Sequence, residues 1–508
     1  PKDNRAIQVG DRMEFEMSQF LAPGLPRGRH NYYGTTFLYI VGEGIVPWLT
    51  RGDFDDKSTE REDSFKIPEA AWLAGHTTLP YMYTNEPDNH FMQMPTNLNF
   101  DNAQPFVLGR RIHHTDFVSG QHDESVENGV FPELVGKSGT HYVNSACSKC
   151  HVRNGRAAPA DIGVPLDKWV FKIGDAAGEP DPDMGRVLQP KNVGINNTND
   201  GEGTVAIESW TEENNLRSPN YSFSRATPDT FSARIAPQLV GLGLLEAIPE
   251  TQILALADET DTNDDGISGK AQRVLDPVSG ETRLGRFGWK AATSSVEHQV
   301  AGALNSDMGV MTSVLPSPDC GTNQSLCGNS GAELSDEHLN NLVKYISLLG
   351  VRPQRNHDDA AVQLGQSLFT TIDCASCHTE TFQTSAYHPF AELRDQTIRP
   401  YTDMLLHDMG PGLADNLGEG LATGAEWRTT PLWGIGLSAC VTGGVTNPTG
   451  HQGDEVCTPN HSYLHDGRAR SIEEAILWHG GEGLTSKNKY EALPASQKQA
   501  MLRFLESL

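Results

Sequence analysis

Apolar side chains recur at helical spacing in two segments of the chain, each of which follows a serine. The segment after Ser471 repeats the spacing of the segment after Ser295 position by position. This spacing predicts two amphipathic helices, each with one face against the interior of the protein. The positions on that face are Val296, Gln299, Val300 and Ala303 in the first segment and Ile472, Ala475, Ile476 and His479 in the second.

The remaining pattern predicts a folded protein with many long, ordered loops. Hydrophobic residues make up 37% of the 508 residues, and 50 glycines and 30 prolines interrupt the periodic segments. Residues 32–42 are rich in β-branched and aromatic side chains and predict a strand. No apolar run approaches the roughly 18 residues of a membrane-spanning helix, so we expect no span.

The alignment of Ser295 with Ser471 extends beyond the two helices and indicates an internal duplication. The segment from Phe287 to Gln299 aligns with the segment that contains His465, without a gap from Trp289 onward. Upstream, Arg234-x-x-Pro237 matches Arg428-x-x-Pro431, with one residue inserted in the segment that follows. The same order of elements in both halves predicts two similar units in tandem.

Two C-x-x-C-H motifs predict the chemistry of these units. Each motif places two thiols beside an imidazole that can ligate iron, which is the attachment signature of haem c, although isolated zinc or redox sites use similar spacings. We therefore expect two covalently bound haem c groups. The motif residues are Cys147, Cys150, His151, Cys374, Cys377 and His378.

The expected fold is mainly α, with two cytochrome-c-like haem domains in tandem, long loops and a partly β N-terminal extension. Residues 1–100 form the extension, whose role the sequence does not indicate. The first haem domain spans residues 101–350 and is expected to be catalytic. The second spans residues 351–508 and is expected to transfer electrons.

The two haem sites are expected to differ in their sixth ligand. In the alignment of the two copies, His479 corresponds to Ala303, so the second iron has an imidazole available where the first has a methyl group. An iron whose sixth position is occupied by a protein ligand transfers electrons, whereas an iron whose sixth position is open binds and activates a small oxidant. His479 as an ordinary helix-face histidine is the alternative. Met409 is a further candidate for the second iron, and Met184 and His298 are candidates for the first.

The charge and the other four cysteines limit the cellular setting. The formal net charge of -27 argues against nucleic-acid binding and leaves either a solvated acidic surface or one that steers a basic redox partner.

Cys320 with Cys327, and Cys440 with Cys457, form local pairs that predict disulfides. The first residues read as a mature end from which any export signal has gone. Because haem c is attached outside the cytoplasm in bacteria, the two motifs imply an exported, periplasmic or extracellular protein.

A loop after residue 260 has the opening of a calcium site. It offers the oxygen ligands of Asp261, Asn263, Asp265 and the backbone of Ile267, around a glycine at the sixth position. The twelfth position holds Gln272 in place of the usual glutamate. A Ca²⁺ held with outside ligands and a metal-free Asx turn are both open.

Residues 100–508 resemble the dihaem oxidoreductases, a family related to bacterial dihaem cytochrome c peroxidases and tryptophan-oxidising dihaem enzymes. The resemblance rests on several motifs together. They are Arg234-Ile-Ala-Pro237, Asp265-Gly-Ile-Ser-Gly, Gly285-Arg-Phe-Gly-Trp289, Pro400-Tyr-Thr-Asp-Met-Leu-Leu-His407, Glu426-Trp427-Arg428, Leu464-His465-Asp-Gly-Arg468 and Trp478-His479-Gly-Gly-Glu482.

The resemblance implies roles for residues around the first haem. Trp289 would lie between the haems as an electron relay, Gln299 would orient the oxidant, and Asp307 would transfer its proton. Asp307 stands about two residues earlier than the glutamate of the peroxidases. Arg428 and Arg468 suit haem propionates by their fork geometry.

We therefore expect an exported dihaem c-type oxidoreductase that is peroxidase-like. Electrons from a small redox protein would pass through the second haem to hydrogen peroxide or oxygen at the first. The alternatives are a dihaem oxygenase or oxidase that acts on an organic or protein substrate, and a two-haem electron carrier.

Overall fold

The computed structural model describes residues 5–19, 33–50, 64–80, 89–192, 201–325, 327–328, 330–449 and 456–508. It is 28% helical and 21% strand, so the expectation of a mainly α fold was wrong. Many small sheets lie between and beside the helices. The division of the chain at residues 100 and 350 stays a prediction.

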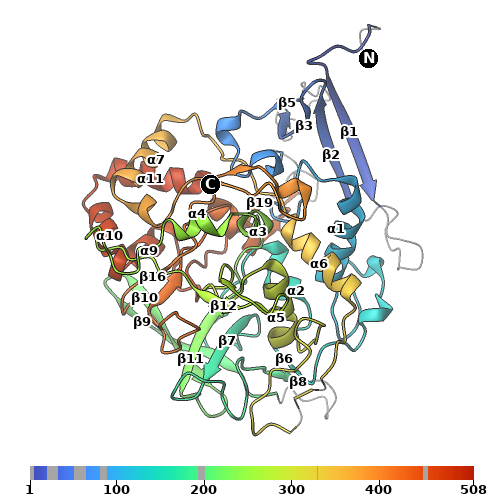
Figure 1. The fold of residues 1–508 in the computed structure, drawn as a ribbon. Coiled ribbons are helices and arrows are strands. Elements are labelled where there is room, and N and C mark those ends of the chain that lie inside the picture. The colour runs from blue at the N-terminus through green and yellow to red at the C-terminus, as the bar shows by residue number, and fades with distance from the viewer. Residues whose placement is uncertain are drawn as a thin grey trace.

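Two pairs of crossed helices lie on opposite sides of the molecule (Figure 1). Helix α1 (Phe100–His113) packs against α6 (Asp336–Ser347), and α7 (Ala360–Thr371) packs against α11 (Ala495–Ser507). Each C-x-x-C-H motif follows the first helix of one pair.

Each crossing depends on one glycine. A side chain at Gly109 would overlap the backbone of Asn341, and a side chain at Gly365 would overlap the backbone of Ala500. The absence of a Cβ atom at these positions therefore lets the two helix backbones approach closely.

Both predicted helices form and their N-termini are built alike, although the second ends at Leu477, before His479. Helix α5 (Val296–Met308) is capped by Ser295, whose hydroxyl accepts the backbone N–H of His298. Helix α9 (Ile472–Leu477) is capped by Ser471 in the same way. Short bridges join Phe287 to Thr293 and Tyr463 to Ala469, again at equivalent positions of the two copies. The structure confirms the internal repeat.

The remaining α-helices are short and connect these elements. They are α2 (Cys147–Cys150), α3 (Leu242–Glu246), α4 (Glu250–Leu254), α8 (Ile435–Gly443) and α10 (Leu484–Glu491). No helix within the described ranges is both long and apolar enough to cross a membrane.

An antiparallel β region between the first motif and α5 supplies much of the strand content that the mainly α prediction lacked. Strand β7 (Trp169–Gly174) pairs with β11 (Thr230–Ile235), and β9 (Val205–Glu213) pairs with β10 (Leu216–Phe223). Alternate side chains of β7, including Trp169 and Phe171, enter a core cluster that also contains Trp289 and Trp427. Residues 169–171 are three consecutive apolar residues, a short run that periodicity alone does not assign to a strand or to a helix.

The N-terminal extension begins with a three-stranded sheet of β1 (Arg12–Gln19), β2 (Tyr33–Ile40) and β3 (Gly44–Val46). The hairpin of β1 and β2 projects from the body of the protein (Figure 1). Strand β2 confirms the strand predicted over residues 32–42. The other strands are β4 (Trp48–Thr50), β5 (Ser64–Lys66), β6 (His141–Tyr142), β8 (Lys191–Asn192), β12 (Arg273–Leu275), β13 (Thr282–Leu284), β14 (Phe382–Gln383), β15 (Thr397–Ile398), β16 (Leu406–Asp408), β17 (Glu426–Arg428), β18 (Val445–Thr446) and β19 (Val456–Cys457).

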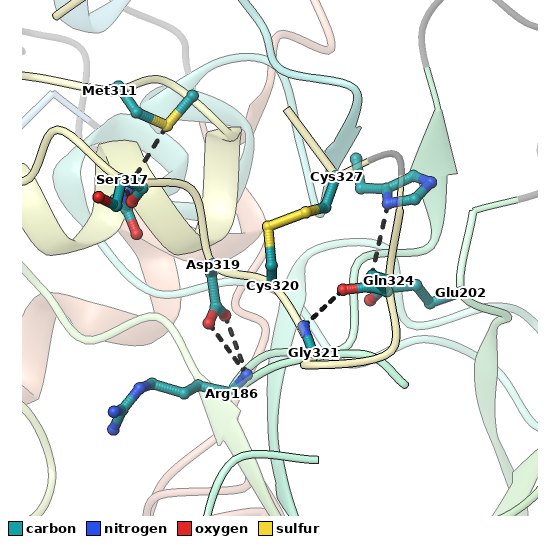
Figure 2. Close-up of a disulfide and its surroundings, with 11 residues drawn as sticks. Arg186, Glu202, Met311, Ser317, Asp319, Cys320, Gly321, Gln324 and Cys327 are labelled. Atoms are coloured by element: carbon teal, nitrogen blue, oxygen red, sulfur yellow. Dashed lines mark hydrogen bonds and ion pairs between the residues drawn. A yellow bond between two sulfur atoms is a disulfide. The ribbon is translucent and has the colours of Figure 1, made fainter. Parts of the chain in front are cut away.

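Both predicted disulfides, Cys320–Cys327 and Cys440–Cys457, are confirmed. Figure 2 shows the first of them in the loop between α5 and α6. Beside it, Asp319 accepts the backbone N–H of Arg186, so the disulfide loop is attached to the β region.

We expect Gly365→Ala to destabilise the protein by about 1–3 kcal/mol, because the new methyl group must push α7 away from α11. The free energy of unfolding in guanidinium chloride measures this effect. Ser367→Ala, on the exposed side of the same helix, is the matched control and should change the stability by less than about 0.5 kcal/mol. Equal stability of the two variants would contradict the role of Gly365.

Candidate active site

One cavity extends between the two C-x-x-C-H motifs. Its wall contains both motif histidines, His151 and His378, and Trp289. It also contains the predicted faces of α5 and α9, so two segments far apart in sequence line the same space.

Three histidines in this wall are oriented in the same way. The Nδ1 atom of His151 lies 2.7 Å from the carbonyl oxygen of Pro237, and that of His378 lies 2.9 Å from the carbonyl oxygen of Tyr401. The Nδ1 atom of His479 lies 2.8 Å from the carbonyl oxygen of Ala475. Because a carbonyl oxygen only accepts, each Nδ1 must donate its proton, which leaves the lone pair of Nε2 for a metal.

Burial keeps these imidazoles neutral. It lowers the pKa of His151 and of His378 to about 4, and it also lowers the pKa of His479. A neutral imidazole is the form that ligates a metal, so all three side chains are prepared for that role at neutral pH.

The four motif cysteines are free thiols, whereas the other four form disulfides. Among the described residues, the grouping of side chains that could hold a metal ion is Cys377, Asp403 and His407. However, Asp403 and Glu482 hold the two ring nitrogens of His407 at 2.8 and 2.6 Å and raise its pKa to about 12. This imidazolium has no lone pair for a metal, which argues against a zinc site at the second motif.

The cavity wall carries different residues at the two equivalent positions that were predicted to set the sixth ligand. Ala303 lies in the wall on α5, and His479 lies in the wall just beyond α9. His298 and Met184 are not among the residues of the described chain that line the cavity, whereas Met409 is. Met409, the further candidate ligand for the second iron, is therefore in the cavity wall, whereas the two further candidates for the first iron are not.

His113 lines the cavity, and the sequence motifs do not indicate it, because it precedes the first motif by more than thirty residues. It ends α1, four residues after Gly109, and its ring lies 5.4 Å from that of Tyr345. In the second unit, Phe369 stands four residues after Gly365, and its ring lies 5.5 Å from that of Phe504. A comparison of the two helices before the motifs would have revealed this substitution.

The three residues predicted for catalysis all line the cavity. Trp289 donates its indole N–H to the carbonyl oxygen of Ile235 at 2.9 Å. Gln299 accepts the hydroxyl proton of Thr293 at 2.8 Å. Asp307 accepts a hydrogen bond of 2.8 Å from Ser306, and burial raises its pKa to about 6. Such a carboxyl group can both release and take up a proton near neutral pH.

Two arginines face the cavity without a carboxylate partner in the described chain. Arg428 donates to the carbonyl oxygens of Gly288 and Thr429, and Arg156 donates to that of Leu464. Both guanidinium groups therefore suit the propionates of a haem. Arg468, predicted for the same role, instead pairs with Asp466 at 2.7 Å and is not in the cavity wall. Arg156 has no motif signal and was missed.

The calcium-like loop lies away from the cavity wall except at Ile267. Asp261 accepts the backbone N–H groups of Asp265 and Gly266, and the amide of Asn263 donates to Asp265. These hydrogen bonds close an Asx-rich turn, and the calcium site stays a prediction.

Paired helix crossings, two C-x-x-C-H motifs and one shared cavity define a two-centre haem protein. The family model described as "Di-haem oxidoreductase, putative peroxidase" matches residues 215–508, and the chain belongs to this family. The resemblance found in the sequence is thereby confirmed. Membership implies two haem cofactors, and the free thiols, the three Nε2 atoms and the two arginines fit them.

The chain is also similar to two solved structures. One is hydrazine synthase of Kuenenia stuttgartiensis, at 13% identity and a TM-score of 0.35 over 89% of this chain and 100% of that chain. The other is a MauG-like protein associated with microbial copper homeostasis, at 15% identity and a TM-score of 0.34 over 87% and 94% of the two chains. A comparison with curated proteins found no match.

We expect Asp307→Asn to change how the stability of the protein depends on pH. The folded-state pKa of Asp307, about 6, lies above the ordinary value of 3.8, so the group stabilises the fold when protonated and loses this contribution as pH rises through 6. The stability of the variant relative to the wild type should therefore increase between pH 4 and pH 7. Unfolding of the holoprotein at a series of pH values tests this, and a constant difference would contradict it.

Proposed function

We propose that this protein is an exported dihaem c-type oxidoreductase that reduces hydrogen peroxide at the His151 site. Electrons from a small redox protein would enter through the haem held by His378 and His479. The observation that carries the proposal is the contrast between Ala303 and His479 at equivalent positions of the repeat, both in the cavity wall. A methyl group leaves the sixth position of an iron open, whereas an imidazole closes it.

Covalent attachment at both motifs is part of this proposal. The thiols of Cys147 and Cys150 precede His151 in the first motif, and Cys374 and Cys377 precede His378 in the second. All four are free of disulfides and partly buried beside the cavity. Export is supported by the two disulfides elsewhere in the chain, which form in oxidising compartments.

The residues of α5 would handle the oxidant and its protons. Reduction of hydrogen peroxide to two waters consumes two electrons and two protons. The haem supplies a site where peroxide binds to iron and exchanges electrons. Asp307 would take the proton from the oxygen nearer the iron and return it to the departing oxygen, while the amide of Gln299 holds the oxidant by hydrogen bonds. The pKa of Asp307, about 6, suits both transfers.

Trp289 would connect the two haem sites. Its ring is buried, with 7% of its surface exposed, and its indole N–H is fixed on Ile235. It lies in the cavity wall together with residues of both motifs. We infer that electrons pass between the haems by way of this indole.

We expect His479→Ala to convert the second haem from low-spin to high-spin, because the variant would lack the imidazole that is proposed to ligate the iron there together with His378. Absorption and EPR spectra of the resting holoprotein measure the high-spin fraction, which should rise by one haem. Met409→Leu is the matched control and should leave the spectrum unchanged. If Met409→Leu changed the spectrum and His479→Ala did not, Met409 would be the ligand. A wild-type spectrum that is wholly low-spin would favour an electron carrier.

We expect Asp307→Asn to lower kcat/KM for hydrogen peroxide by about 10²- to 10⁴-fold, because the amide cannot transfer the proton. Steady-state turnover with a reduced cytochrome c as electron donor measures the loss. Asp307→Glu should restore part of the activity, and Asp336→Asn, on the surface at the start of α6, should have no effect. Full activity of Asp307→Asn would exclude the role of this carboxyl group. Absence of peroxide turnover in the wild type, with formation of an oxygen complex, would favour an oxygenase.

A further inference from the structure

Trp289, His465 and Trp427 form a row of three buried rings, here named the stack, in which His465 and Trp427 lie face to face and Trp289 meets His465 edge-on. The ring of His465 lies 6.5 Å from that of Trp289 at an angle of 73°, and 3.8 Å from that of Trp427 at an angle of 14°. All three rings line the cavity, and each residue is at most 7% exposed. An electron hole on Trp289 therefore has a second oxidisable indole within reach, at the far end of the stack.

The backbone holds this stack in place. The N–H of Ile235 donates to the carbonyl oxygen of His465 at 2.7 Å, and the N–H of Arg428 donates to that of Trp289 at 2.8 Å. The indole N–H of Trp427 donates to the carbonyl oxygen of Leu413 at 3.1 Å. Because each ring residue is anchored in this way, the contacts of the stack are fixed features of the fold.

A buried ammonium group covers the far end of the stack. Lys290 is fully buried, and its Nζ atom lies 4.0 Å from the ring centre of Trp427. It donates to the carbonyl oxygens of Thr423 and Gly424 at 2.6 and 3.0 Å, with Asp415 at 3.5 Å. Arg234 also lies 6.0 Å from the same ring, but Glu419 pairs with its guanidinium group at 2.6 Å and balances its charge. The positive charge of Lys290, at 4.0 Å, strongly opposes the formation of an indole radical cation.

The cation near Trp289 is Arg156, which faces the cavity. Its guanidinium group lies 5.4 Å from the ring of Trp289 and has no carboxylate partner in the described chain. A haem propionate bound there would cancel its charge. The ammonium group of Lys290, with its carboxylate partner Asp415 at 3.5 Å, lies closer to the ring of Trp427 than the guanidinium group of Arg156 lies to that of Trp289. The nearer cation raises the cost of oxidising Trp427, so Trp289 is the indole that is easier to oxidise.

We propose that Lys290 is a positioning residue whose charge keeps the electron hole on Trp289 and prevents its passage through His465 to Trp427. This inference rests on the proposed function. When hydrogen peroxide takes electrons and the donor is absent, Trp289 loses one electron. Transfer of the hole would move one electron from Trp427 to Trp289 and leave Trp427 as the radical cation. Blocking that step holds the hole between the haems, where the next donor electron refills it.

The test uses Lys290→Gln, which removes the charge but retains a hydrogen-bond donor for the carbonyl groups. Lys270→Gln is the matched control, because Lys270 donates to Leu421 of the same loop but is not placed over Trp427. Holoprotein is mixed with hydrogen peroxide without a donor and frozen for EPR, and oxidation of Trp427 is then measured by peptide mass spectrometry. We expect at least about fivefold more Trp427 radical and oxidation in Lys290→Gln than in the wild type or the control.

A second substitution makes the result specific. The additional radical should disappear in the double variant Lys290→Gln/Trp427→Phe and persist in Lys290→Gln/Trp169→Phe, which changes a tryptophan of the same core cluster outside the stack. Unchanged oxidation of Trp427 in Lys290→Gln, or a signal that survives Trp427→Phe, would overturn the inference. A lack of any change in haem absorption with peroxide in all proteins would instead overturn the proposed function, and this inference with it.

A pH series adds an independent measurement. Burial lowers the pKa of Lys290 to about 8, so its charge is lost as pH rises from 7 to 9. The groups that face it are Asp415, Arg234, Glu419 and, across the indole ring, His465, whose pKa burial lowers to about 3, so that it stays neutral in this range. Oxidation of Trp427 should rise over this interval in the wild type and stay level in Lys290→Gln. Parallel curves for the two proteins would count against the role of Lys290.

Discussion

The hydrogen bonds from the Nδ1 atoms of His151, His378 and His479 to backbone carbonyls are the constraint on which the site depends. A buried imidazole must place its N–H on an acceptor, and doing so fixes the tautomer, the ring plane and the direction of Nε2. For His151 the acceptor is Pro237, which lies beyond the whole inserted β region in sequence. The position of this acceptor, and with it the orientation of His151, therefore depends on the β region.

The same structural plan is used twice, and the differences between the copies suggest the function. Helix crossings at Gly109 and Gly365, and serine caps at Ser295 and Ser471, repeat closely. One position differs: Ala303 in the first copy corresponds to His479 in the second. Trp289 and His465 are likewise equivalent positions of the repeat, and their rings meet between the two halves. Duplication thus supplies the scaffold, and under the proposed function single substitutions within it would separate a site that binds oxidant from one that transfers electrons.

The site could be predicted further than the fold. Spacing alone located both motifs, the two cavity-lining helix faces and both disulfides, because each depends on residues close together in sequence. The strands β7 and β11 were not predicted, since short segments pair only through contacts between distant parts of the chain. Arg156 and His113 were missed for a related reason: nothing local distinguishes a buried guanidinium or imidazole that faces a cavity from one at the surface.

The sequence by itself determined the two C-x-x-C-H motifs, the internal repeat and membership of the dihaem family, because covalent chemistry and helical periodicity act over a few residues. Tertiary structure decided which arginines face the cavity and that Arg468 is neutralised by Asp466. It also decided that Trp289, His465 and Trp427 form one stack under the charge of Lys290. These properties arise from burial and from distances between segments far apart in the chain, which no local pattern of residues specifies.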